Sequence, residues 1–297
     1  MISITAEEVG LFARLIHDRT GIALDFGKAY LLENRLAPLL EEAGVTSFGE
    51  FFRLVSRSPA WVPRIIDAIA TNETSFFRDQ RPFSLLRDKL LPELLGRRRA
   101  ESDASLPPAL RVWSAACSTG QEAYSVGMIV AELLGAEAGA WQVRIVGTDI
   151  SNAAVVRASE GVYSRFEVDR GVPDRLRDKY FTPLGERLRV EAGLRAMSVF
   201  LEANLLAPPD NLGQFDLIFC RNVGIYFNQE NRRRLFANIA RHLRPDGALF
   251  IGSTESLLGV CDLFVRRECL NAVYFQPRPG AAEPAPPQAS PAAGIKG

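Results

Sequence analysis

The spacing of apolar residues over positions 1–70 is helical throughout. Thr5 and Glu8 form a capping-box pattern ahead of a helical apolar stripe, and residues 47–50 repeat that pattern. Five leucines share one stripe over 28–42, and another apolar set follows Pro59. The pattern predicts a small helical bundle with its own core.

From residue 110 onward, buried strands alternate with helices. Residues 110–116 predict a short strand, 114–120 a turn of small residues, and 121–130 a helix. A second strand over 143–150 carries Asp149 at its carboxyl end, and 216–220 predicts another buried strand. This alternation predicts an open, doubly wound, mostly parallel α/β sheet, which binds ligands at the carboxyl ends of its strands.

Two segments interrupt this alternation. Short alternating runs around Gly193, within 162–203, predict a small antiparallel piece inserted in the sheet, and we assign 199–201 to it. Residues 277–297 contain six prolines among alanine and glycine, which predicts a disordered tail.

The segment between the two parts, 71–78, is rich in short hydrogen-bonding side chains. Such a run disfavours a helix and is apt to wrap a ligand. Phe76 and Phe77 are expected in the core, and Arg78 beside them is expected to face a site. We expect Asp79 or a neighbour to cap a helix that runs to about Arg97, followed by a polar surface link over 97–109.

The first strand–turn–helix unit lacks the motifs of phosphate-binding loops. It contains neither G-x-G-x-x-G nor a Gly-Lys-Ser/Thr sequence. Glu122, in the first helical turn, would repel a pyrophosphate and suits a cationic ligand. Asp149 lies where a ribose-binding carboxylate belongs. These acids indicate an S-adenosylmethionine site rather than a nicotinamide site.

At this point the sequence resembles a known family. Residues 113–125, WSAACSTGQEAYS, resemble the signature of the chemotaxis receptor methyltransferases of the CheR type, which is close to WSAACSTGEEPYS. Three more stretches match in order: TNETSFFR at 71–78, GTDIS at 147–151 and FDLIFCRNVGIYF at 215–227. The resemblance extends over roughly residues 5–276.

The resemblance implies a domain plan. An all-α domain over 1–70 would dock onto the receptor, and 71–90 would form a linker that contacts the cofactor. A methyltransferase domain over 91–276 would contain the β-subdomain at about 162–203. In some members of the family that subdomain grips a peptide at the receptor's C-terminus by strand addition; whether this chain does so is left open.

The implied reaction is transfer of a methyl group from S-adenosylmethionine to a chemoreceptor glutamate, giving a γ-methyl ester and S-adenosylhomocysteine. A glutamate has an ordinary pKa of about 4.3 and is already ionised at neutral pH, so no general base is required. A chain with only two histidines agrees with that.

The resemblance also implies the site residues, from the matched motifs and from the positions of Asn204 and Leu205. Arg78 and Tyr226 are candidates for orienting the substrate carboxylate, with core packing as the alternative for Tyr226 and helix capping for Asn72 and Thr74. By resemblance, Asp149 would accept hydrogen bonds from the ribose. The residues expected around the cofactor are Asn72, Thr74, Arg78, Glu122, Asp149, Asn204, Leu205, Arg221 and Asn222.

Two departures from the family pattern concern this site. Gln121 and Ala123 stand where glutamate and proline are usual, which leaves Glu122 in place. Gly224 replaces a bulky residue between Asn222 and Tyr226, and we expect it to loosen the turn that sets Tyr226.

Composition bears on nucleic-acid binding, on metal and redox sites, and on membrane insertion. With 35 basic and 35 acidic residues the net charge is zero, which gives no case for nucleic acid. The four cysteines show no C-x-x-C spacing, so neither zinc nor a redox pair is indicated. No leader and no apolar run of about 18 residues is present, so we expect a soluble cytoplasmic protein without membrane insertion, and a monomer.

The partner expected from the resemblance is the cytoplasmic domain of a methyl-accepting chemoreceptor. A basic face on the helical bundle would speed encounter with an acidic receptor. That face comprises Arg14, Arg19, Lys28, Arg35, Arg53, Arg57 and Arg64.

Three rival functions are weighed against methyl transfer. A cofactor-binding sensor or scaffold predicts loss of Arg78, Asp149 or Tyr226, and all three are present. A dehydrogenase predicts a glycine-rich first turn, and a nucleic-acid methyltransferase predicts an aromatic residue after the prolines of 204–210; both are absent.

Overall fold

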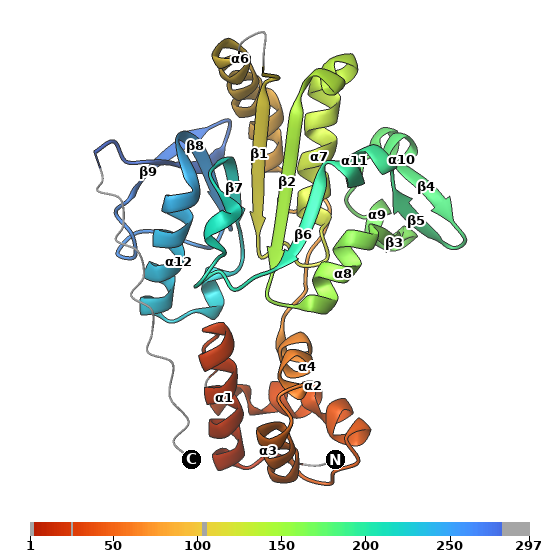
Figure 1. The fold of residues 1–297 in the computed structure, drawn as a ribbon, viewed down its shortest axis with the longest axis vertical. Helices are drawn as coiled ribbons and strands as arrows, with labels where there is room; N and C mark the ends of the chain where they lie inside the picture. Colours follow the sequence, from red (N-terminus) through yellow and green to blue (C-terminus); the bar gives the residue numbers. More distant parts are fainter. Residues whose placement is uncertain (1–2, 25, 103–105, 281–297) are drawn as a thin grey trace.

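The computed structural model describes residues 3–24, 26–102 and 106–280, so most of the predicted tail lies outside the described residues. Figure 1 shows a helical bundle joined to a larger sheet domain, with the small antiparallel sheet at one side of it. Within the described part of the chain, no helix is both long and apolar enough to cross a bilayer.

The bundle has the predicted helices. They are α1 (Ala6–Thr20), η1 (Phe26–Lys28), α2 (Ala29–Glu42), α3 (Phe48–Arg57) and α4 (Trp61–Ile69). Thr5 and Glu8 make both hydrogen bonds of the capping box. The second box is incomplete: Ser47 accepts from the amide of Glu50, but the Glu50 carboxylate accepts from Thr46.

One expectation for the bundle surface is wrong. Arg35 was placed on the exposed basic face, but its Nη1 donates to the carbonyls of Ile69 at 2.6 Å and Ala70 at 2.8 Å. It therefore satisfies the carbonyls at the end of α4, where helices leave their last acceptors without partners. Arg64 is half-buried and paired with Glu42.

The main sheet has seven strands in the order β6-β2-β1-β7-β8-β10-β9, mostly parallel, as predicted. They are β1 (Ala109–Ala115), β2 (Gln142–Asp149), β6 (Ser198–Glu202), β7 (Phe215–Cys220), β8 (Leu243–Ile251), β9 (Phe264–Cys269) and β10 (Ala272–Pro277). Only β10 runs antiparallel, to both β8 and β9. In the register, Val112 of β1 lies between Ile145 of β2 and Leu217 of β7.

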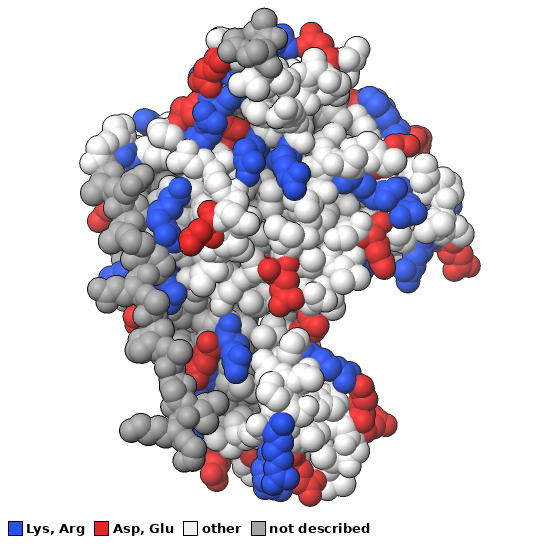
Figure 2. Space-filling view, in the orientation of Figure 1, with Lys and Arg blue, Asp and Glu red and all other residues white. Residues whose placement is uncertain are grey.

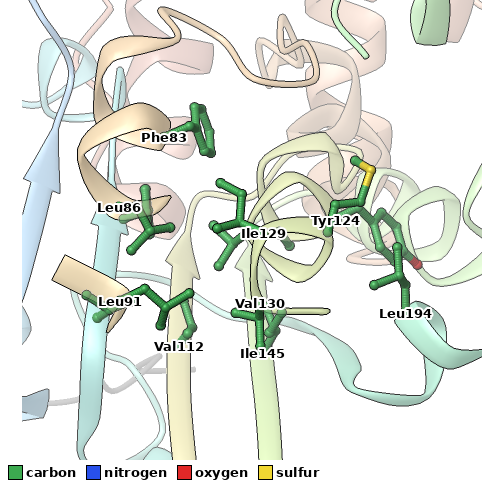
Figure 3. Packing of buried hydrophobic residues seen from close by; sticks show 14 of the residues in the cluster. Phe83, Leu86, Leu91, Val112, Tyr124, Ile129, Val130, Ile145 and Leu194 are labelled. Carbon is green, nitrogen blue, oxygen red and sulfur yellow. The ribbon is translucent and has the colours of Figure 1, made fainter. Parts of the chain in front are cut away.

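Helices cover both faces of this sheet. One face packs α5 (Arg81–Leu85), the π-helical turn η2 (Leu86–Leu90), α6 (Leu91–Glu101), α7 (Gln121–Leu134) and α8 (Asn152–Glu160). Figure 3 shows apolar side chains of this layer facing the central strands: Phe83, Leu86, Leu91, Ile129 and Val130 around Val112 and Ile145. The other face packs α12 (Gln229–His242), whose N-cap is Asn228 as expected. Short helical turns η3 (Gly135–Ala140), η4 (Asp210–Leu212) and η5 (Gly224–Tyr226) complete the layers.

The predicted antiparallel insertion is present. It comprises β3 (Val162–Ser164), β4 (Phe181–Leu184) and β5 (Arg187–Val190), with α9 (Arg165–Asp169), α10 (Asp174–Tyr180) and α11 (Ala192–Ala196). Residues 199–201 were wrongly assigned to it. They belong to β6, which pairs parallel with β2, because Phe200 packs in the main core.

The prediction for 79–109 is wrong in two respects. The residue before α5 is Gln80, without a side-chain cap, and Asp79 instead pairs with Arg221. The expected surface link from 97 is helical to Glu101, and the Arg98 side chain is 4% exposed. Arg98 donates to Asp216 and Asp246, which lie more than 100 positions later in the chain, so no local sequence pattern indicates these ion pairs.

Candidate functional site

A cavity of about 220 Å³ lies at the carboxyl ends of the strands. Its walls come from segment 71–78, the ends of β1, β2, β6 and β7, and residues 20–22 of the bundle. Every predicted site residue lines it: Asn72, Thr74, Arg78, Glu122, Asp149, Asn204, Leu205, Arg221, Asn222 and Tyr226. The predicted residues that share this cavity span 154 positions of the chain, from Asn72 to Tyr226.

The turn after β1 is tightly curved. Ala116 and Ser118 have positive φ angles of 62° and 50°, and Gly120 has 94°. A Cβ on Gly120 would lie 2.9 Å from the Cβ of Ala158, so only glycine fits there. This curvature directs the Ser118 amide at the end of β2.

The carboxylate of Asp149 accepts a hydrogen bond from the Ser118 amide. Its Oδ2 accepts from Ser118 N at 2.8 Å and its Oδ1 from Ser151 N at 3.0 Å. Burial raises the pKa of Asp149, and the amides of Ser151 and Ser118 oppose that rise. Each carboxylate oxygen keeps a second lone pair, so Asp149 can also accept from the hydroxyls of a ribose.

Glu122 and Arg221 form the opposite wall. Glu122 Oε1 accepts from Ser114 Oγ at 2.7 Å, and its Oε2 accepts from Arg221 Nη1 at 3.0 Å. Arg221 Nη2 donates to Asp79 Oδ2 at 2.7 Å and to the Arg78 carbonyl at 2.9 Å. Two carboxylates and one guanidinium leave one negative charge, and Asp149 adds another.

One nitrogen of Arg221, its Nε, makes no hydrogen bond within the described part of the chain. The Arg221 side chain is 2% exposed. Buried donors are normally satisfied, so this N–H is a position where a bound ligand would add a hydrogen bond.

Segment 71–78 is held mainly through its backbone. Ser118 Oγ donates to the Asn72 carbonyl at 3.2 Å, and Arg170 Nη2 donates to the Thr74 carbonyl at 2.6 Å. Phe77 N donates to Ser125 Oγ at 2.9 Å. No helix begins at Asn72 or Thr74, so neither side chain caps one, and both lie along the cavity.

The loop that carries Asn222 and Tyr226 is not loose, contrary to the expectation from Gly224. The Glu255 carboxylate accepts from the amides of Asn222 at 2.7 Å, Gly224 at 2.8 Å and Gly252 at 2.7 Å. A Cβ on Gly224 would lie only 3.0 Å from Glu255 Oε1. Gly224 therefore allows a close approach of Glu255, and Tyr226 is partly exposed at the cavity.

Asn204 and Leu205 contribute in different ways. Asn204 Nδ2 donates to the Arg19 carbonyl of α1 at 3.0 Å, and its Oδ1 accepts from Leu206 N at 2.9 Å. Leu205 is buried, and its carbonyl accepts from Asn238. Asn204 thus joins the cavity to the bundle, while Leu205 gives it an apolar wall.

Several residues of the site escaped the sequence analysis. Asp79, Ser114 and Glu255 all hold groups of the cavity wall through hydrogen bonds. Glu255 follows the carboxyl end of β8, and polar residues at strand ends were the one available signal for it.

The carboxylates of the site are not grouped as metal ligands within the described ranges. Within residues 3–24, 26–102 and 106–280, no three His, Cys, Asp or Glu side chains are grouped to hold a metal ion. Burial raises the pKa of Cys117 well above its usual range, so its thiol stays protonated. Two carboxylates with no phosphate loop fit a nucleoside that carries positive charge, as S-adenosylmethionine does.

Two family models match this chain. The "CheR methyltransferase, SAM binding domain" matches residues 72–272, and the "CheR methyltransferase, all-alpha domain" matches residues 7–70. Among curated proteins, Chemotaxis protein methyltransferase Cher2 of Pseudomonas putida is 34% identical, covering 89% of this chain and 96% of its own. Chemotaxis protein methyltransferase 1 of Pseudomonas aeruginosa is 36% identical, covering 90% and 96%.

The chemotaxis protein methyltransferase of Escherichia coli is 36% identical, and the match covers 82% of each chain. Among solved structures, a TehB-like SAM-dependent methyltransferase from Corynebacterium glutamicum covers 68% of this chain and 96% of its own at 16% identity. Its TM-score of 0.37 is too low to bear on the site.

Proposed function

The chain belongs to the CheR family of S-adenosylmethionine-dependent methyltransferases of chemotaxis, and from that premise we propose that it methylates glutamate side chains of chemoreceptors. The product would be a γ-glutamyl methyl ester on the cytoplasmic domain of a methyl-accepting receptor. The reaction would then take place in the cytoplasm, with the enzyme as a monomer.

The observation that supports this proposal best is the contrast between the two arginines of the cavity. Arg221 is already paired with Glu122 and Asp79. Arg78 has no carboxylate partner among the described residues, and its Nη1 donates only to the Glu73 carbonyl, at 3.0 Å. Its guanidinium is therefore free to receive an incoming carboxylate, for which its planar fork is suited.

The acceptor needs orientation rather than activation. A glutamate carboxylate is ionised at neutral pH because its ordinary pKa is about 4.3. No histidine lies among the described residues that line the cavity, which agrees with a reaction that uses no general base. Arg78 and Tyr226 would align the carboxylate, and correct alignment alone can lower the barrier by several kcal/mol, up to about 7–11.

The remaining residues of the wall would hold the cofactor. When bound, S-adenosylmethionine supplies the methyl group, which the acceptor oxygen takes as the carbon–sulfur bond breaks to leave S-adenosylhomocysteine. Asp149 would accept from the ribose, and Glu122 would place negative charge near the sulfonium. Asn72, Thr74, Asn204, Leu205, Arg221 and Asn222 would line the cofactor.

The helical bundle would make the first contact with the receptor. Four arginines of the expected basic face are exposed: Arg14, Arg19, Arg53 and Arg57. Because Arg35 holds the end of α4, it is omitted from this surface.

The test mixes the protein with methyl-labelled S-adenosylmethionine and a receptor cytoplasmic fragment, then releases the label with mild base. We expect base-labile methanol from the receptor. Arg78→Ala should lower kcat/KM by about 100-fold or more, since a small misplacement of a reactant costs that much. Arg144→Ala, an exposed arginine at the far end of β2, is the matched control.

Two results would contradict the proposal. Cofactor binding without transfer to any receptor would favour the alternative, a sensor or scaffold that binds S-adenosylmethionine. Turnover by Arg78→Ala equal to that of the wild type would remove Arg78 from the mechanism.

A further inference from the structure

A second cavity, of about 490 Å³, lies beside the methyl-transfer site. We call it the hairpin groove. It is bounded by residues 79–82 before and within α5, the loop after β8 over 252–262, and the β9–β10 hairpin. Figure 1 shows this end of the sheet opposite the small antiparallel sheet, and the strand order places β9 at the edge. The groove is thus distinct from the small antiparallel sheet and from the bundle.

The hairpin groove and the first cavity share a wall. Arg221 lines both cavities, and its partner Asp79 lines the groove. Arg221 reaches Glu122 on the cofactor side with Nη1 and Asp79 on the groove side with Nη2. One side chain therefore separates the groove from the cavity that contains Arg78 and Tyr226.

The charges of the groove are unequally available to a ligand. Two of its acids are engaged within the protein: Asp79 with Arg221, and Glu255 with three backbone amides. Apart from the buried Arg221, its arginines face solvent. Arg81 has no carboxylate partner among the described residues, and the side chain of Arg278 donates only to the backbone carbonyl of Asp262.

Arg266 is the third cation of the groove. Its ion pair with Glu268 joins two side chains that are 59% and 58% exposed, so it is weak and easily exchanged. Three exposed arginines outnumber the two exposed acids of the groove, Asp79 and Asp262, and Asp79 is already paired with Arg221, so the rim is net positive. Such a rim favours an acidic partner.

The surface between these charges is apolar. Ile251, Phe264 and Phe275 form its buried part, and Leu258 stands 92% exposed at its edge. An apolar strip with a cationic rim is complementary to an amphipathic segment that has apolar residues on one face and carboxylates beside them.

We propose that the hairpin groove binds the acidic, amphipathic receptor segment that flanks the acceptor glutamate. This inference rests on the proposed function. A segment lying in the groove would pass beside Arg221, next to the cavity where the acceptor carboxylate must arrive. The chain's own residues 281–297 match the groove poorly, because they contain one acid, Glu283, and one base, Lys296.

The test uses the full chain with a receptor cytoplasmic fragment. Arg266→Glu and Arg278→Glu are each compared with Arg144→Glu, an exposed residue on β2 that changes the net charge equally. We measure KM for the receptor, Kd for S-adenosylmethionine, and direct receptor binding to the chain saturated with S-adenosylhomocysteine, which does not depend on turnover.

Each groove variant should raise both KM and the receptor Kd about five-fold at low salt, because the loss of an exposed ion pair costs up to about 1 kcal/mol. In the groove variants, kcat and the affinity for S-adenosylmethionine should stay unchanged. The control variant Arg144→Glu should match the wild type in all of these measurements. Equal effects of groove and control variants would overturn the proposal.

Two further outcomes separate the possibilities. In the first outcome, the groove variants bind the receptor more weakly, but the wild type transfers no label to it. That result would support the groove as a receptor-binding site and contradict the proposed reaction. The second outcome concerns a chain that ends at Gly280. If that chain binds the receptor more tightly, and if Arg266→Glu and Arg278→Glu have no effect in it, the groove belongs to the chain's own C-terminal segment and the proposal is overturned.

Discussion

At the scale of single residues, the site is organised by charged groups that hold backbone as well as ligand. Glu255 joins three amides from two loops, and Arg221 joins Glu122, Asp79 and a carbonyl. Hydrogen bonds to charged groups contribute more than neutral ones, about 1.5–3 kcal/mol. Tyr226, which we propose to align the acceptor carboxylate, is therefore only as well placed as the Glu255 carboxylate that holds its loop.

Glu255→Ala should lower kcat about ten-fold or more while changing cofactor affinity less, because the loss of three amide acceptors releases the loop of Tyr226. Glu255→Gln retains one acceptor oxygen and should restore part of the rate. Steady-state kinetics with S-adenosylmethionine titration measure both effects. Glu160→Ala, an exposed glutamate on α8, is the control, and equal kcat in Glu255→Ala and wild type would refute the positioning role.

At the scale of elements, ion pairs attach the inserted subdomain to the main domain. Glu132 on α7 accepts from Lys179 at 2.6 Å and from Tyr180 at 2.7 Å, both on α10, and pairs with Arg175. The hydrogen bond from Lys179 is the main cause that lowers the pKa of Glu132 from 4.5 to about 2; burial opposes it, and hydrogen bonds from Tyr180 and Arg175 add to the lowering. Part of the attachment is thus electrostatic and depends on pH, beside the apolar contacts of Tyr163, Phe181 and Leu188 with the main core.

A lowered pKa means that Glu132 stabilises the folded state above its ordinary pKa and loses this contribution as pH falls from about 4.5 to about 2. Glu132→Gln should therefore be less stable than wild type at pH 7 and nearly equal to it at the acid end of that range. Denaturant unfolding at several pH values measures the difference. A stability difference that does not change with pH would show that Glu132 acts through packing instead.

At the scale of the whole molecule, the bundle is a wall of the cofactor site. The backbone of Ala23 donates to the Tyr226 carbonyl at 2.9 Å, and Ile22 bridges to Phe227. Asp67 of α4 accepts from Ser151 Oγ at 2.8 Å and from Ala153 N at 3.2 Å, so the bundle caps the start of α8. Figure 2 shows the surface hollowed between the two bodies on one side.

Asp67→Ala should weaken S-adenosylmethionine binding about five-fold, because a lost helix cap costs about 1 kcal/mol and frees Ser151, whose amide contacts Asp149. Titration calorimetry measures the affinity, and hydrogen exchange over 71–78 reports whether the bundle moves. Asp210→Ala, on an exposed turn, is the control. Unchanged affinity with faster exchange would mean that the bundle is not needed to hold the cofactor.

The sequence alone determined the local parts of this protein. Apolar periodicity predicted the bundle, the parallel sheet and the antiparallel insertion, because each depends on neighbours a few residues apart. The motifs at 71–78, 113–125, 147–151 and 215–227 contain eight of the ten predicted residues that line one cavity, and the family resemblance supplied the other two, Asn204 and Leu205. These predictions depend on strand ends, which share one edge in any parallel sheet.

Only the tertiary structure decided which charges pair. Arg221 pairs with Asp79 over a separation of 142 positions and with Glu122 over 99 positions. Arg98 and Asp216 are 118 positions apart. The same applies to Arg35, which fits a solvated helix face in sequence but reaches the end of α4 in the fold. Such contacts depend on how separate elements pack, and packing is decided by the combined shape of the core rather than by any local pattern.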